Sequence, residues 1–347
     1  MANPLIIKLK KIAAWTLSLL LTGLVVVVTV TIGWRPLLGA KSRPLTERQF
    51  ARTPERLERG RYLVNSVAGC FDCHSEVSKQ PPKAGEPPKF SKLGAGRIAI
   101  NQKGFVLAIP NITPDIETGA GTWTDDQFAR AIREGIGHDG RTLFPMMPYE
   151  DFRHFSDEDL ASVVVYIRSL EPVHNQLPKR QLPFVLKRLI NSVPQPIQTP
   201  VKEVSGQLQR GEYLAELGGC SYCHTPKDKM GHPLPGMDFA GGSQLEEGLA
   251  ISANITPDPS GISYYDENLF IKTMRTGHVG ARPLKLPMPW WVYRNMTDDD
   301  LKAIFAYLRT VKPVQHRVDN DEQATLCKLC NQKHGLGADN HKFLAKR

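Results

Sequence analysis

The sequence predicts an all-α protein in which an N-terminal transmembrane helix precedes two tandem helical domains. Three observations support this fold class. An uncharged, mostly apolar run lies near the N-terminus, residues 12–33. Apolar residues recur at helical spacing between capping residues and prolines, and no run of strand alternation is convincing. A block of sequence also recurs after about 143 residues, and 347 residues suit two domains of ordinary size.

The apolar run 12–33 is long enough to cross a membrane. As a helix its 22 residues span about 33 Å, against a hydrocarbon core of about 30 Å. Trp15 and Trp34 lie near its ends, as in the aromatic belts of membrane helices. A cleaved signal peptide is the alternative, with Leu-Gly-Ala at 38–40 as a weak cleavage site, but its apolar core is usually only about 7–15 residues. We expect a retained anchor after a lysine-containing stub, residues 1–11.

The repeat divides the rest of the chain. Asn-Ile-Thr-Pro-Asp at 111–115 recurs at 254–258, and Asp-Leu at 159–160 recurs at 300–301. Two copies with this spacing indicate tandem domains rather than a solenoid. A proline-rich segment between them is typical of a semi-rigid linker. The predicted units are a first domain at 50–175, a linker at 176–204, a second domain at 205–316 and a Cys/His-containing tail at 317–347.

Capping residues locate the helices within each copy. Ser156 and Thr297 each precede an apolar series of period 3.6 that a proline ends, and Thr124 with Gln127 forms a capping box. Residues 58–68 and 208–217 are expected to be helices that lead into a cysteine pair.

Each copy carries one Cys-x-x-Cys-His motif, the attachment signature of c-type haem. Two thiols one turn apart can form thioethers with the two vinyl groups of a porphyrin, and the adjacent imidazole then faces the iron. A thioredoxin-like redox motif does not need the histidine, and half a zinc site would need a second ligand pair nearby. The sequence therefore predicts two covalently bound haem c groups, on Cys70, Cys73 and His74 and on Cys220, Cys223 and His224.

A methionine in each copy is the candidate sixth iron ligand. The candidates are Met146 and Met147 in the first copy and Met288 in the second, each in a proline-rich loop before the last helix of its repeat. We prefer Met147 over Met146 because Met147-Pro-Tyr mirrors Met288-Pro-Trp. Simple core packing of these methionines is one alternative, and ligation by His138 and His278 is another. A His/Met pair raises the potential and leaves no open iron position, so no catalytic residues are predicted.

Haem attachment also orients the anchor. Bacterial c-type haem is ligated outside the cytoplasmic membrane, so we expect the stub in the cytoplasm and both domains facing the periplasm or outer side. A mitochondrial or chloroplast protein is the alternative. The formal net charge is +9. No motif supports nucleic-acid binding, and a basic surface favours an acidic redox partner or anionic lipid.

Further motifs extend the pattern of the first copy: Gly-Thr-Trp-Thr-Asp at 121–125, Asp-Gly-Arg at 139–141, Pro-Met-Met-Pro-Tyr at 145–149 and Ser-Asp-Glu-Asp-Leu at 156–160. In this order they resemble the cytochrome c subunits of membrane-associated alcohol and gluconate dehydrogenases. The resemblance implies two class I cytochrome c folds with methionine as distal ligand. It also implies electron transfer from a dehydrogenase toward a quinone-linked complex or a terminal oxidase.

The same resemblance places the Asn-Ile-Thr-Pro-Asp loop close to haem. Asn111, Thr113, Asn254 and Thr256 are then candidates to hydrogen-bond the propionates; a simple Asx/Pro turn is the alternative. The chain departs from these subunits in having two intact haem motifs rather than three, and in having Tyr265 where the first copy has Trp123.

The tail holds a third Cys-x-x-Cys pair, Cys327 and Cys330, but Asn331 stands where a haem motif needs histidine. Three interpretations are open: a local disulfide, a small metal site with His334, and a degenerate haem motif.

The function predicted from these features is that of a membrane-anchored dihaem electron carrier. Its expected partners are a dehydrogenase subunit, a quinone-linked complex or an oxidase, together with membrane lipid around the anchor. The alternative is a dihaem oxidoreductase, a peroxidase or a sulfur-compound oxidising enzyme, with one open iron.

Overall fold

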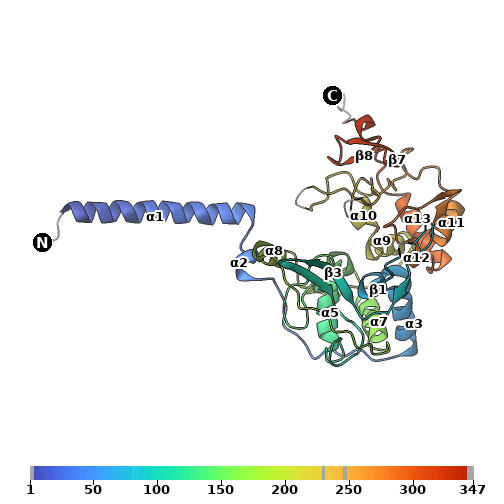
Figure 1. Ribbon diagram of the computed structural model, residues 1–347, viewed down its shortest axis with the longest axis horizontal. Helices are drawn as coiled ribbons and strands as arrows, with labels where there is room; N and C mark the ends of the chain where they lie inside the picture. Colours follow the sequence, from blue (N-terminus) through green and yellow to red (C-terminus); the bar gives the residue numbers. More distant parts are fainter. Residues whose placement is uncertain (1–3, 81, 84, 229–230, 245–247, 342–347) are drawn as a thin grey trace.

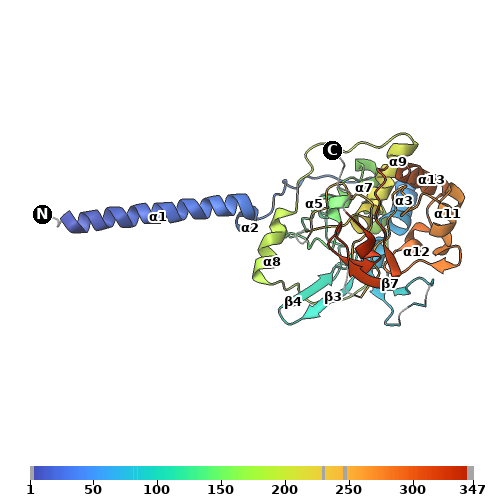
Figure 2. The same cartoon turned by 90° about the horizontal axis from the view of Figure 1, so that it is seen from above.

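The computed structural model describes residues 4–80, 82–83, 85–228, 231–244 and 248–341. The ends of the predicted stub and tail, residues 1–3 and 342–347, lie outside this range. Helix α1 (Pro4–Thr31) projects away from the remaining chain (Figures 1 and 2), and its side chains are exposed almost throughout. It is the one helix among the described residues that is long and apolar enough to cross a membrane, with mean hydropathy 2.2. The short helix α2 (Arg35–Leu38) follows it.

The two repeats have matching helices. The predicted caps are confirmed: Ser156 and Thr297 each accept a hydrogen bond from the third residue of the following helix, and Thr124 forms a complete capping box with Gln127. The first repeat contains α3 (Pro54–Tyr62), α4 (Cys70–His74), α5 (Asp125–Glu134), α6 (Tyr149–Phe152) and α7 (Asp157–Ile167). The second contains α9 (Gln207–Leu217), α10 (Cys220–His224), α11 (Glu267–Thr276), α12 (Trp290–Tyr293) and α13 (Asp298–Leu308).

Each repeat is built on the packing of its first helix against its last, α3 on α7 and α9 on α13. A glycine makes each crossing possible. A Cβ atom on Gly60 would lie 2.0 Å from the carbonyl oxygen of Ser162, and one on Gly211 would lie 2.0 Å from that of Ala303. Only a residue without a side chain allows the two backbones to come so close.

A π-helix, η1 (Leu63–Val67), follows α3 in the first repeat, whereas α9 of the second is regular. Tyr62 precedes the first haem-motif cysteine by eight residues, and Tyr213 precedes the second by seven. A π-turn accommodates one extra residue within a helix. The two tyrosines therefore keep corresponding positions despite the difference in length.

The prediction of an all-α fold is wrong. The described residues include four two-stranded antiparallel sheets. The longest in the first repeat pairs β3 (Arg97–Gln102) with β4 (Phe105–Ile109) across a turn at Lys103 and Gly104. Strand β3 is half-buried to exposed and contains an irregular register, and β4 buries Leu107 and Ile109 on one face. The sequence of β4 is apolar at every position, so neither strand shows the apolar/polar alternation that marks a strand with one buried face. The other pairs are β1 (Glu76–Val77) with β2 (Phe90–Ser91), β5 (His278–Val279) with β6 (Arg282–Pro283), and β7 (Asp319–Leu326) with β8 (Lys333–Gly335).

The segment between the repeats packs back onto the first. Gln181 forms a bridge with Val106 of β4, and α8 (Phe184–Leu189) with the 3-10 turn η2 (Ile190–Ser192) contacts α2. In the tail, the 3-10 turn η3 (Gly337–Asp339) follows β8. The domain boundaries that we drew from the sequence stay a prediction.

The two repeats contact each other through equivalent residues. Tyr62 donates to Asp300 of α13 at 2.5 Å, and Tyr213 donates to Asp159 of α7 at 2.7 Å. Each aspartate also pairs with an arginine of its own repeat, Asp159 with Arg59 and Asp300 with Arg210. The contact is thus reciprocal, and it brings α12 against η1 and α6 against α9.

Candidate haem sites

The first Cys-x-x-Cys-His motif forms a single helical turn, α4, that begins after Gly69. Gly69 adopts the left-handed conformation (φ 56°), which turns the chain sharply between η1 and α4. His74 is 6% exposed, and its Nδ1 lies 2.8 Å from the carbonyl oxygen of Pro110. A proton on Nδ1 leaves Nε2 as the ligand atom. Burial lowers the pKa of His74, which favours the neutral imidazole that iron requires.

The second motif repeats this geometry. Gly219 adopts φ 67° before α10, and His224 Nδ1 lies 2.7 Å from the carbonyl oxygen of Ala253. Burial likewise lowers the pKa of His224. Pro110 and Ala253 directly precede the two Asn-Ile-Thr-Pro-Asp loops. The loop start therefore orients the histidine of each motif, a role that the sequence did not reveal because a backbone carbonyl carries it.

A glycine also holds each loop against its motif. Gly96 donates its N–H to the carbonyl of His74 at 2.7 Å, and Gly241 donates to that of His224 at 2.6 Å. Both adopt positive φ, and a Cβ on either would lie 2.4 Å from backbone atoms of the facing loop. Each histidine is thus fixed through both its ring and its main chain.

The asparagines and threonines of these loops are buried and bonded within the protein. Asn111 Oδ1 accepts from the N–H and hydroxyl of Thr113, and Asn111 Nδ2 donates to Val173 at 2.7 Å. Asn254 makes the same bonds to Thr256 and Val314. These bonds tie each loop to the chain after the last helix of its repeat. The propionate contacts stay a prediction.

Met147 and Met288 occupy equivalent turns. Met147 donates its N–H to Phe144 at 3.1 Å and Met288 donates to Lys285 at 3.2 Å. The proline after each has nearly the same backbone angles, and it directly precedes α6 or α12. Met147 packs against the hydrophobic core whereas Met146 is 41% exposed, which is consistent with the preference for Met147. Iron ligation by either methionine stays a prediction.

Two aromatic residues beside these methionines were not predicted from the sequence. Tyr149 packs its ring against Gly135, and Trp290 packs against Gly277, where a Cβ atom would lie 2.7 Å and 2.4 Å from the rings. Tyr149 is 2% exposed, yet its hydroxyl finds no hydrogen-bond partner among the described residues. A buried hydroxyl without a partner is unfavourable, so this orphan beside Met147 fits a polar group that a haem brings. The signal available in the sequence was the aromatic residue after each Met-Pro pair.

The alternative histidine ligands, His138 and His278, differ in their surroundings. His138 is exposed and stacks on Trp123, with ring centroids 4.5 Å apart. His278 is half-buried, and its Nδ1 lies 2.9 Å from the carbonyl of Thr276.

The two haem motifs approach each other across the contact between the repeats. Trp291 of the second repeat donates its indole N–H at 2.8 Å to Asp72, which lies inside the first motif. Tyr222, inside the second motif, has its pKa raised mainly by burial and in part by Cys223 and by Cys73 of the first motif. The structure therefore holds both candidate sites next to one interface.

Comparison with known proteins identifies the first repeat. Residues 57–171 match the cytochrome c family. The chain contains a cytochrome c domain. This domain implies a covalently bound haem c, and it coincides with the first motif, the His74 geometry and the orphan hydroxyl of Tyr149.

Curated relatives extend the similarity into the second repeat. The chain is 33% identical over 269 residues to the fructose dehydrogenase cytochrome subunit of Gluconobacter japonicus, covering 74% of this chain and 52% of the relative. It is 28% identical over 274 residues to the gluconate 2-dehydrogenase cytochrome c subunit of Pantoea cypripedii, covering 74% and 59%. It is 28% identical over 259 residues to a dihaem cytochrome c-type protein of Cereibacter sphaeroides, covering 72% and 84%.

The predicted resemblance to dehydrogenase cytochrome c subunits, including those of alcohol and gluconate dehydrogenases, is thereby confirmed. The chain spans somewhat more than half the length of the fructose, alcohol and gluconate dehydrogenase subunits that it matches.

Proposed function

We propose that this protein is a membrane-anchored dihaem cytochrome c that passes electrons from a dehydrogenase toward a quinone-linked complex or a terminal oxidase. One observation carries the proposal. Two Cys-x-x-Cys-His turns have the same histidine-to-carbonyl geometry, 2.8 Å and 2.7 Å, and lie beside one interface. Two matched haem sites beside the same interface suit electron transfer from one haem to the other, whereas two sites far apart would not.

Each haem would supply a one-electron Fe(III)/Fe(II) couple. The chain's own residues would hold it in defined ways. Cys70 and Cys73, and likewise Cys220 and Cys223, would be the thioether attachment points. His74 and His224 would be the proximal ligands, each kept in one tautomer by a backbone carbonyl. Met147 and Met288 would close the distal side, and a sixth ligand on both irons leaves no site for a substrate.

Helix α1 supports the proposal that the chain is anchored in a membrane. Its length, its hydropathy and its exposure suit a span in the cytoplasmic membrane, with the repeats on the periplasmic side, where c-type haem is attached. In membranes washed with alkaline carbonate, the full chain should stay in the pellet and keep its first residues. Release into the wash, or a mature N-terminus after residue 38, would overturn the anchor.

A redox titration of the detergent-solubilised holoprotein tests the haem sites. We expect two haems per chain by pyridine haemochrome assay, a far-red ferric band typical of methionine ligation, and no spectral change when carbon monoxide is added to the reduced protein. One haem per chain would overturn the dihaem proposal. A carbon monoxide shift at one haem would mean an open iron, and the protein would then be assayed as a peroxidase or a sulfur-compound oxidoreductase.

A further inference from the structure

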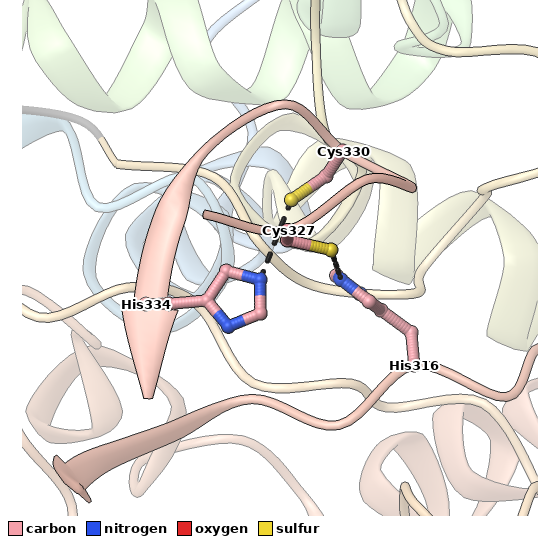
Figure 3. A group of neighbouring side chains, drawn as sticks. All are labelled: His316, Cys327, Cys330 and His334. Carbon is pink, nitrogen blue, oxygen red and sulfur yellow. Dashed lines mark hydrogen bonds between the residues drawn. The ribbon is translucent and has the colours of Figure 1, made fainter. Parts of the chain in front are cut away.

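Four buried side chains converge at the start of the C-terminal tail, and none of them belongs to either Cys-x-x-Cys-His motif. Cys327 and Cys330 lie in the turn between β7 and β8, His334 lies on β8, and His316 lies between α13 and β7 (Figure 3). Their potential ligand atoms are all within 4.8 Å of one another, and none of the four side chains is more than 2% exposed. The sequence indicated Cys327, Cys330 and His334 as one candidate metal site, and it gave no sign of His316.

The distances suit a tetrahedral metal. Cys327 Sγ lies 3.4 Å from His316 Nε2, and Cys330 Sγ lies 3.4 Å from His334 Nε2. Zinc bonds of about 2.3 Å to sulfur and about 2.0–2.1 Å to nitrogen separate two tetrahedral ligands by about 3.6 Å. A small inward or outward adjustment of the side chains is enough to place one ion between all four.

Both histidines already have the tautomer that a metal needs. His316 Nδ1 lies 2.8 Å from the carbonyl of Ala240, and His334 Nδ1 lies 3.0 Å from that of Gly335. The two Nε2 atoms therefore face the sulfurs without protons, the arrangement typical of metal-bound histidine.

The backbone around the two cysteines also suits a metal site. The N–H of Leu329 points at Cys327 Sγ at 3.4 Å, a contact that stabilises a thiolate. Gly242 has φ +90°, and a Cβ there would lie 2.7 Å from the His316 ring and 3.2 Å from Cys330 Sγ. The space for the cluster therefore depends on a residue without a side chain.

Comparison of the two repeats shows how His316 is set up. In the first repeat, Asn175 donates its side-chain N–H to Ala95 at 2.9 Å and its backbone N–H to Thr118 at 2.9 Å. His316 makes the same two bonds in the second, to Ala240 and to Ser260. The histidine thus keeps the structural role of the asparagine and adds one nitrogen, which faces the tail.

We propose that His316, Cys327, Cys330 and His334 bind one structural zinc ion. The ion would fix the β7–β8 hairpin to the loop of residues 240–242, whose Gly241 holds the main chain of His224. The metal would brace the second repeat without touching its iron.

The two other interpretations of the cysteine pair explain less. A disulfide would leave both buried Nε2 atoms without a strong partner, which is unfavourable. A haem motif requires the helical turn seen at α4 and α10. Residues 328–330 instead form a turn that ends at Asn331 in the left-handed conformation, φ 58°.

Metal analysis of the purified full chain tests the proposal independently of the number of haems. We expect about one zinc per chain by elemental mass spectrometry. The two cysteines should react with a thiol reagent only after a chelator and a denaturant are added. H316N is the informative variant, because asparagine is the equivalent residue in the first repeat, Asn175, and can keep the hydrogen bond to Ala240. The zinc content per chain of H316N should be lower by about tenfold or more.

H341A is the matched control, since His341 lies on the same tail but is exposed, and it should keep its zinc. Normal haem spectra of H316N would show that the variant has folded. Three results would overturn the proposal. An intact protein mass lower by two hydrogens would mean a disulfide between Cys327 and Cys330. Free reaction of both thiols in a protein without metal, or full retention of zinc by H316N, would show that the four residues do not hold a zinc ion together.

Discussion

Tyr62 of the first repeat donates a hydrogen bond of 2.5 Å to Asp300 of the second. Burial and then this bond raise the pKa of Tyr62 to about 12, so the phenol is a neutral donor at physiological pH. Tyr62 also accepts from the N–H of Thr297, as Tyr213 accepts from that of Ser156. The two tyrosines therefore connect each repeat to the N-terminus of the other's last helix.

Replacing either tyrosine by phenylalanine should weaken the contact between the repeats. A hydrogen bond to a charged group contributes about 1.5–3 kcal/mol, so Y62F and Y213F should each lower the free energy of unfolding by about that amount. Chemical denaturation of the holoprotein measures it. The matched control is Y307F, because the described residues offer no hydrogen-bond partner to that hydroxyl; a loss as large in the control would contradict the assignment.

Alanine at either crossing glycine should be far more disruptive. A Cβ on Gly60 or Gly211 would collide with a backbone carbonyl at 2.0 Å, which forces α3 from α7 or α9 from α13. We expect G60A and G211A to destabilise by about 3 kcal/mol, or to prevent folding. G23A, in α1 with no neighbour within 4 Å, should melt as the wild type does. Wild-type melting of G60A would show that the helices pack less tightly than described.

Acid should weaken the attachment of residues 43–46 to the first repeat. Asp126 is fully buried and accepts two hydrogen bonds of 2.7 Å from Arg43 and two more from Thr46. Burial alone would raise its pKa, but these partners lower the pKa below the ordinary 3.8. A lowered pKa gives stabilisation that is complete above the unfolded value of about 3.9 and is lost as pH falls through the folded value.

D126N should therefore be less stable than the wild type at pH 7, by about 3 kcal/mol. The difference should shrink below about pH 4. Unfolding midpoints between pH 3 and pH 7 check this, with D139N on an exposed loop as control. A difference that is independent of pH would mean that Asp126 acts through packing alone.

Neighbouring methionines offer a direct test of iron ligation. M147A should open the first iron, abolish half of the far-red ferric band and admit carbon monoxide, and M288A should do the same at the second. M146A changes the adjacent, exposed residue and should leave the spectrum unchanged. If M146A, and not M147A, lost the far-red band and bound carbon monoxide, Met146 would be the iron ligand.

Local features of this molecule were predictable and long-range ones were not. The caps at Thr124, Ser156 and Thr297 depend on residues three positions apart, so the sequence identifies them. The bonds from His74 to Pro110 and from His224 to Ala253 use backbone oxygens 36 and 29 residues away, which leave no residue-type signal. His316 lies 11 residues before Cys327, outside any compact Cys/His motif.

The β3–β4 hairpin escaped prediction for another reason. Strand β3 is half-buried to exposed, and β4 is apolar at every position although only Leu107 and Ile109 of that strand are buried. Edge pairs of this kind lack the period of two that a half-buried strand shows. Lys103 and Gly104, which form the turn, were the available signal, but Lys-Gly is weaker than Asn-Gly.

Tyr62 and Tyr213 make equivalent hydrogen bonds in opposite directions between the two repeats. Each repeat carries both halves of the contact, a donor on its first helix and an acceptor on its last. Such self-complementarity is the hallmark of an isologous dimer. The two repeats therefore meet as the subunits of a symmetric dimer do, although one chain carries both, and the extra residue in η1 leaves the reciprocal contact intact.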